Sequence, residues 1–63
     1  MKNLKRIRQS RNMTQRELAR ETGIKPTTLN NYETGRRFPN EEKLVNLANA
    51  LDCTVDELLR GEA

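Results

Sequence analysis

Hydrophobic residues recur every three or four positions along most of the chain, which is the spacing of amphipathic helices. The clearest example lies in residues 15–22 and 26–34, two short runs separated by a polar step and a glycine. Their apolar positions are Leu18, Ala19, Ile24, Leu29 and Tyr32. Ala19 is small enough to allow a close crossing, so the pattern predicts two helices packed across a tight turn.

Local signals mark the ends of these two helices. Thr14 and Glu17 form the T-x-x-E pattern of a capping box, which predicts a helix that starts at Gln15. Gly23 ends this helix, because glycine enters the left-handed conformation at little cost. Pro26 opens the second helix, since proline at the first helical position gives up only an amide that had no partner.

The remaining apolar spacings predict a single all-α domain over residues 1–63, a compact five-helix bundle with no strand pattern, repeat or linker. The three further helices are expected at residues 3–11, 41–51 and 55–59, with residues 61–63 as a frayed end. Asn40 is expected to cap the fourth helix, and Thr54 with Glu57 repeats the capping box for the fifth. The core should also include Leu4, Ile7, Met13, Leu44, Leu47, Ala48, Leu51, Val55 and Leu58.

The outer face of the second short helix consists of small polar groups. Pro26, Thr27, Asn30 and Asn31 lie on a common arc. Asparagine can pair bidentately with adenine, and threonine or proline can contact a thymine methyl group. On an isolated helix such a face would simply be solvated. As the second helix of a helix-turn-helix, however, it is expected to enter the major groove of DNA.

Charge is divided unevenly along the chain, whose formal net charge is +3. Residues 1–37 hold ten lysines and arginines and three glutamates, a charge of +7, whereas residues 38–63 carry −4. The first part should therefore attract phosphate. Arg36 and Arg37 directly follow the second short helix, where side chains reach the flanking DNA backbone.

The composition argues against an enzyme. General acid-base catalysis uses a histidine or a carboxylate in a cleft, and this chain has no histidine and places its carboxylates mainly at cap positions and exposed faces. We therefore expect no catalytic residue, cofactor, metal or small-molecule ligand. The single cysteine, Cys53, cannot form an internal disulfide and is expected to pack in the core.

No stretch of the sequence is apolar and long enough to span a membrane, and residues 1–11 lack the pattern of a secretory signal. We therefore expect a cytoplasmic protein. Sixty-three residues leave no room for an effector-sensing domain. Either concentration and partners regulate the protein, or the chain is the DNA-binding part of a longer one.

Several motifs together resemble the Cro and phage-repressor helix-turn-helix family, also called XRE-like, from about Leu4 to Leu59. They are T-Q-x-E-L-A at 14–19, the turn Gly23, Y-E-x-G at 32–35, F-P-N at 38–40, L-x-x-L-A-x-A-L at 44–51 and T-V-D-E-L-L at 54–59. The resemblance implies a lambda-repressor-like DNA-binding domain with the helix-turn-helix at its second and third helices.

The resemblance also assigns roles to individual residues. It implies that Arg8 pairs with Glu33, joining the first helix to the recognition helix. The residues expected to face base edges are Lys25, Pro26, Thr27, Asn30 and Asn31. The residues expected to contact the DNA backbone are Thr14, Gln15, Arg36, Arg37 and Asn40. Lys25 departs from the family, which usually places a capping serine or threonine there, so the cap of this helix must be weak or supplied otherwise.

From the resemblance we therefore expect a sequence-specific, double-stranded DNA-binding transcriptional regulator, a repressor, that inserts its third helix in the major groove. It should be of bacterial or phage origin and associated with the nucleoid. The alternative is a protein-interaction module of the same fold, such as an antitoxin or a co-regulator. The polar outer face and the +7 part favour DNA, because a protein-binding version should expose apolar residues there.

A weak homodimer on a palindromic operator is also expected, because one recognition helix covers only a few base pairs. In the family the surface around the last helix commonly makes this contact. The corresponding residues here are Val55, Glu57 and Leu59.

Overall fold

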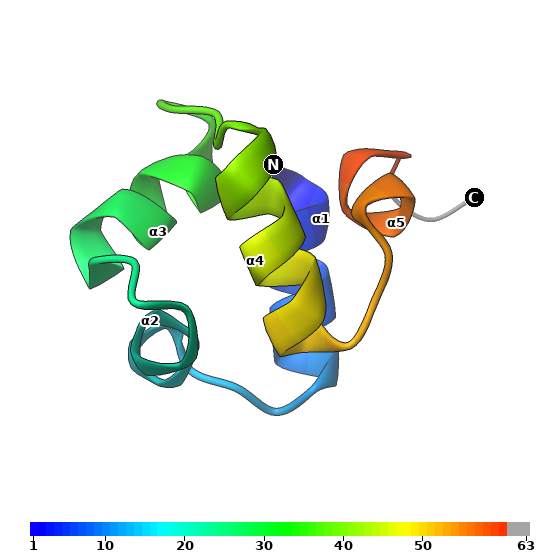
Figure 1. The fold of residues 1–63 in the computed structure, drawn as a ribbon. Helices are drawn as coiled ribbons and strands as arrows, with labels where there is room; N and C mark the ends of the chain where they lie inside the picture. The colour runs from blue at the N-terminus through cyan, green and yellow to red at the C-terminus, as the bar shows by residue number, and fades with distance from the viewer. Residues whose placement is uncertain (61–63) are drawn as a thin grey trace.

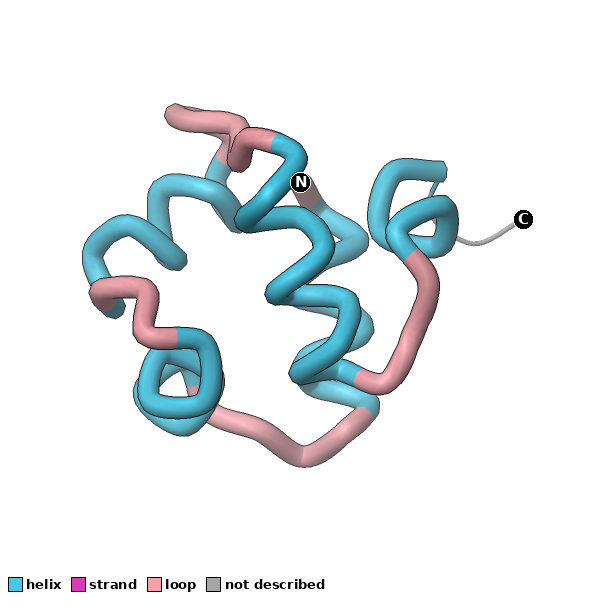
Figure 2. The backbone as a smooth tube through the Cα atoms, in the orientation of Figure 1, coloured by secondary structure: helices cyan, strands magenta, loops and turns pink. Residues whose placement is uncertain are grey.

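The computed structural model describes residues 1–60 and is all-helical there, with no strand among those residues (Figures 1 and 2). The five helices are α1 (Lys2–Ser10), α2 (Gln15–Thr22), α3 (Pro26–Thr34), α4 (Glu41–Leu51) and α5 (Val55–Arg60). The predicted five-helix fold is confirmed. The bounds of α2, α3 and α4 are those expected, and those of α1 and α5 differ by one residue. The frayed end predicted for residues 61–63 lies outside the described residues.

The helices α1 and α4 form the middle of the bundle (Figure 1). The pair α2 and α3 packs on one side of them, and α5 packs on the other. This arrangement leaves the outer side of the α2–α3 pair uncovered by the rest of the described chain. In residues 1–60 no helix is long and apolar enough to cross a membrane.

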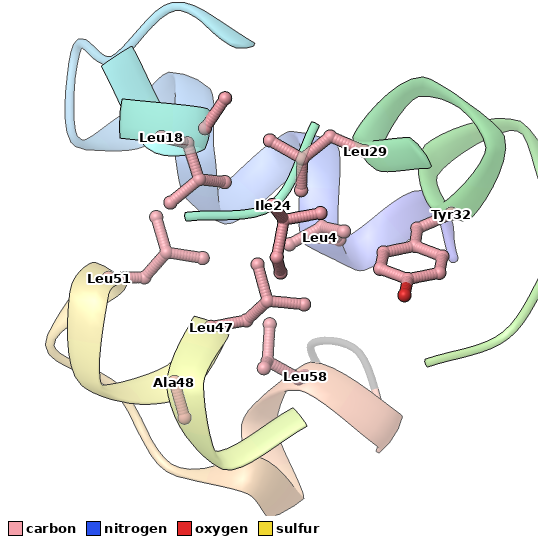
Figure 3. Packing of buried hydrophobic residues seen from close by; sticks show 10 residues of the cluster. Leu4, Leu18, Ile24, Leu29, Tyr32, Leu47, Ala48, Leu51 and Leu58 are labelled. Atoms are coloured by element: carbon pink, nitrogen blue, oxygen red, sulfur yellow. The ribbon is translucent and has the colours of Figure 1, made fainter. Parts of the chain in front are cut away.

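Leucines from all five helices form the core (Figure 3). The fully buried ones are Leu4, Leu18, Leu29, Leu47, Leu51 and Leu58. Burial of one such side chain contributes about 1.5–3 kcal/mol. The prediction that Ile7, Met13 and Val55 belong to this core was too generous, since they are only partly buried at its margin.

Two helices end without glycine, which the sequence analysis did not predict. Asn12 after α1 and Asp52 after α4 adopt the left-handed conformation, with φ of 58° and 54°. Asparagine and aspartate tolerate this conformation better than other non-glycine residues. Arg11 joins the two ends: its Nε donates to the Leu51 carbonyl at 2.8 Å and its Nη2 to the Asp52 carbonyl at 3.2 Å.

Candidate nucleic-acid interface

The start of α2 has a side-chain cap in which Thr14 and Glu17 bond each other. The Thr14 hydroxyl accepts a hydrogen bond from the Glu17 backbone N–H at 3.0 Å, and the Glu17 carboxylate accepts one from the Thr14 backbone N–H at 2.8 Å. This is the predicted capping box. The N–H groups of Gln15 and Arg16 are the ones that a helix start leaves without an intrahelical partner. They are available to an anion at this end of the helix.

The turn between α2 and α3 is tight and internally bonded. Gly23 has a φ of +76°, a conformation that side chains disfavour, and its N–H donates to the Ala19 carbonyl at 2.8 Å. The Thr22 hydroxyl donates to the Leu18 carbonyl at 2.8 Å and accepts the Ile24 N–H at 3.2 Å. These bonds fix the angle at which α3 leaves the turn.

The start of α3 differs from that of α2, because within the described residues no side chain caps it. Lys25 occupies the N-cap position in an extended conformation, and Pro26 follows as the first helical residue. Proline brings no N–H, so the N–H groups of Thr27 and Thr28 are the exposed donors of this helix end. As expected for a lysine at this position, the start of α3 has no side-chain cap within the described residues.

The two long sides of α3 have opposite characters. Its inner side buries Leu29, Tyr32 and Glu33, and Figure 3 shows Leu29 and Tyr32 at the core. All five residues expected to face base edges lie away from that core: Lys25, Pro26, Thr27 and Asn30 are exposed, and Asn31 is half-buried. The fold thus presents these side chains together, on a helix held from behind.

The pair of Arg8 and Glu33 is present and buried, with side chains that are only 8% and 3% exposed. Arg8 Nε donates to Glu33 Oε2 at 2.7 Å, and its Nη2 donates to Oε1 at 3.2 Å. Arg8 Nη1 also donates to the Met13 carbonyl at 2.7 Å. A bidentate arginine-carboxylate pair fixes geometry as well as charge, so it sets the position of α3 relative to α1.

The Gln15 side chain, which is expected to contact a DNA phosphate, is hydrogen-bonded within the protein in this structure. Its Nε2 donates to Glu33 Oε1 at 2.9 Å and to Asn30 Oδ1 at 3.2 Å. Both amide protons are therefore used within the protein. A phosphate at the start of α2 would meet the backbone N–H groups of Gln15 and Arg16 instead.

The segment after α3 carries the two arginines expected at the DNA backbone. Gly35 ends the helix with a φ of +87°. The backbone N–H groups of Arg36 and Arg37 both donate to the Asn31 carbonyl, at 2.9 and 3.2 Å. The side chains of both arginines are exposed. Asn40, also expected at the backbone, has an intramolecular role: its Oδ1 accepts the Lys43 N–H at 2.9 Å and caps α4.

Exposed charges in the described chain follow the division seen in the sequence. Exposed basic side chains lie on and beside the α2–α3 pair, namely Arg16, Arg20, Lys25, Arg36 and Arg37, and outnumber the exposed acidic side chains of α2, Glu17 and Glu21. Acidic side chains lie on and beside α4 and α5: Glu41, Glu42, Asp52, Asp56 and Glu57. The side of the molecule with the predicted reading face is therefore the side that favours phosphate.

The residues expected at a dimer contact lie on α5, across the bundle from α2 (Figure 1). Leu59 is 51% exposed, whereas Val55 is half-buried against the core. The Glu57 carboxylate accepts the Thr54 N–H at 2.8 Å, and hydrogen bonds from Thr54 lower the pKa of this carboxyl. The Glu57 backbone carbonyl accepts a hydrogen bond from Asn3, which joins α5 to α1.

Cys53 lies between α4 and α5 and packs against the core, partly buried. Burial raises the pKa of its thiol, and the nearby Glu57 carboxylate raises it further. A raised pKa keeps the thiol protonated and unreactive at neutral pH. Cys53 therefore packs at the margin of the core, as Ile7, Met13 and Val55 do, and not within it as the sequence predicted.

Three curated relatives illustrate what the chain is similar to. The transcriptional repressor RstR of the cryptic phage CTXphi of Vibrio cholerae is 43% identical over 51 residues, which cover 81% of this chain and 46% of RstR. Multiprotein-bridging factor 1 of Candida glabrata is 39% identical over 62 residues, 98% of this chain and 38% of that protein. The HTH-type transcriptional activator BcrR of Enterococcus faecalis is 36% identical over 59 residues, 94% of this chain and 29% of BcrR.

The chain spans about half or less of the length of the curated relatives that it matches. No solved structure matches it significantly. The family model for helix-turn-helix proteins matches residues 4–58, a range that runs from α1 into α5 and contains the α2–α3 pair. By that match, this chain belongs to the helix-turn-helix family.

Proposed function

We propose that the chain is a DNA-binding domain of a transcriptional regulator and binds double-stranded DNA sequence-specifically, with α3 in the major groove. The observation that carries this proposal is the outer side of α3. There Thr27, Asn30 and Asn31 present hydrogen-bonding groups beside Pro26, all held by a buried inner side. These are side-chain types that discriminate base edges. Relatives named as transcriptional regulators support the same conclusion.

The surrounding charges supply the part of binding that does not depend on sequence. Arg36 and Arg37 follow α3 directly and are exposed. The N–H groups at the start of α2 offer a second contact for a phosphate. Contacts of this kind position a protein on the duplex without reading it.

A selection experiment tests both parts of the proposal. Fragments bound from random duplexes would define the preferred site, and affinity would then be measured on that site and on random DNA. Asn31→Ala should weaken binding to the preferred site by about 1–3 kcal/mol and barely affect binding to random DNA. Arg37→Ala should weaken both and reduce the slope of log affinity against log salt by about one. A wild-type protein that prefers no duplex over random DNA would contradict the proposal.

We propose repression as the regulatory outcome, because a domain that occupies operator DNA excludes competing proteins by occupancy alone. The relatives include one named as a repressor and one named as an activator. A reporter assay measures whether binding lowers or raises transcription. The selected site is placed across a promoter in one plasmid and upstream of the promoter in a second. Increased transcription from the upstream site would contradict repression.

We also propose that two copies bind a palindromic site as a weak dimer through the exposed end of α5. Leu59 is the main exposed apolar group there, and such a small patch fits a dimer that DNA stabilises. Two recognition helices should then lie about 34 Å apart, one turn of DNA. Analytical ultracentrifugation with a palindromic duplex measures the stoichiometry. A complex of one protein per duplex at saturation would rule the dimer out.

A protein-interaction module is the second candidate, and the similarity to a multiprotein-bridging factor favours it. Such a module should use an exposed apolar surface. The outer side of α3 is polar instead, which is why we prefer DNA as the partner of this surface. The selection experiment separates the two functions, because a protein-interaction module would show no preferred duplex.

A further inference from the structure

The side chains of Gln15, Asn30 and Glu33 form one hydrogen-bonded chain between α2 and α3. Gln15 Nε2 lies at its centre, 2.9 Å from Glu33 Oε1 and 3.2 Å from Asn30 Oδ1. Arg8 holds the far end of this chain through the buried pair with Glu33. A continuous set of contacts therefore runs from the buried ion pair to an exposed residue on the predicted reading face.

The chemistry of these groups dictates how both amides are turned. An ionised carboxylate only accepts hydrogen bonds, so Gln15 must turn its NH₂ group toward Glu33. The opposite orientation would place the Gln15 oxygen against the carboxylate oxygen, and an unsatisfied contact of that kind is costly. Because Gln15 also donates to Asn30, Asn30 must offer its oxygen. The Nδ2 group of Asn30 then carries two N–H donors that make no hydrogen bond within the described residues.

We propose that Gln15 is a positioning residue that orients the Asn30 amide as a hydrogen-bond donor, and that Asn30 thereby selects the N7 acceptor of a purine in the major groove. The acceptors on base edges there are N7 of adenine and guanine, O6 of guanine and O4 of thymine, whereas cytosine presents only its N4 donor. N7 is the acceptor that the two purines share. The proposal rests on DNA binding as proposed above. It specifies which atom of one base in the site accepts the hydrogen bond from Asn30.

The neighbouring asparagine provides a contrast. Within residues 1–60 the side-chain amide of Asn31 makes no hydrogen bond. This side chain can therefore turn to pair with adenine through both its oxygen and its nitrogen. Asn30 is held by Gln15 and cannot turn without losing that bond. Two adjacent residues of the same type therefore read DNA in different ways.

The first test needs no DNA. Gln15→Met keeps the size of the side chain and removes its hydrogen bonds, and Gln9→Met makes the same change at an exposed position of α1. In ¹⁵N-labelled protein we expect the Asn30 NH₂ resonances to shift in Gln15→Met and to stay in place in Gln9→Met. Asn30 resonances that are the same in wild type and Gln15→Met would overturn the positioning role.

The second test uses the site obtained by selection. Replacing the contacted purine by its 7-deaza analogue should weaken wild-type binding about tenfold, and Asn30→Ala should remove that dependence. Gln15→Met should reduce the preference for purine over cytosine at this position, whereas a merely structural role would weaken binding to every duplex equally. Gln9→Met should behave as wild type.

Asn30→Asp provides the sharpest outcome. An aspartate can still accept the Gln15 N–H with one oxygen, but it offers DNA an acceptor and no donor. Selection with this variant should therefore favour a base that presents a donor, cytosine through N4 or adenine through N6. A retained guanine, which presents only acceptors there, would overturn the inference.

The two proposals fail in different ways. A wild-type protein without any preferred duplex contradicts the proposed function, while the resonances of Asn30 still report on Gln15. A preferred duplex that tolerates every 7-deazapurine leaves the proposed function in place and overturns this inference.

Discussion

The two helices of the helix-turn-helix are stabilised at different places. The start of α2 has a complete capping box formed by Thr14 and Glu17, and its end is closed by Gly23. The start of α3 has Lys25 where a cap would stand, which places a positive charge at the positive end of the helix dipole. The inner side of α3, with Leu29 and Glu33, holds this helix in place instead.

This difference shows where the fold gives up local stability. A capped α3 would have one of its first N–H groups bonded and no cation beside the others, so its start would attract phosphate less. An uncapped start leaves N–H donors and a cation at the edge of the proposed reading face. Conflicts with local preference are expected at functional sites, which agrees with the proposed role of this helix start in DNA binding.

The largest effect is expected from the inner side of α3. Leu29→Ala should lower the free energy of unfolding by about 2–5 kcal/mol, because Leu29 is fully buried and its removal leaves a cavity. Leu59→Ala is the matched control, since Leu59 is exposed and should change stability by about 0.5 kcal/mol or less. Urea unfolding followed by circular dichroism measures both. Equal losses for the two variants would show that α3 is not anchored by its inner side.

The buried ion pair should give the next largest effect. Arg8→Met strands the Glu33 carboxylate in the interior, so the free energy of unfolding should fall by about 1–3 kcal/mol. Arg60→Met is the control, because Arg60 pairs with Asp56 at 3.0 Å in an exposed i, i+4 pair whose loss should cost about 0.3–0.5 kcal/mol. An unchanged unfolding midpoint in Arg8→Met would mean that the pair contributes no more than a surface contact.

The sequence predicted the features of the fold that depend on short spacings. The T-x-x-E patterns at Thr14 and Thr54 gave the starts of α2 and α5, and Gly23 gave the turn. Such signals involve residues three or four apart, whose geometry is nearly the same in every helix. The residues on the outer side of α3 followed for the same reason, since their exposure needs only the helical period.

Contacts between distant residues could not be predicted in this way. The bonds from Arg11 to the end of α4 join residues 40 and 41 positions apart, and nothing in the local sequence specifies them. The Gln15 side chain was expected at a phosphate, because its position at the start of α2 indicates one. The Glu33 carboxylate is an ionised acceptor within reach of the Gln15 side chain. Its proximity appears only once α2 and α3 are packed.

The smallest predicted effect tests the two helix starts directly. Thr14→Ala should lower the free energy of unfolding by about 1 kcal/mol, because α2 loses its cap. Lys25→Ser should raise it by a similar amount, since serine can accept an N–H of α3 and removes the charge that opposes the dipole. Lys25→Met separates the two causes, as it removes the charge and adds no cap. Unfolding in urea measures stability, and binding to the selected site should weaken in both Lys25 variants. If Lys25→Ser instead lowers stability, the start of α3 is already satisfied and the contrast with α2 is wrong.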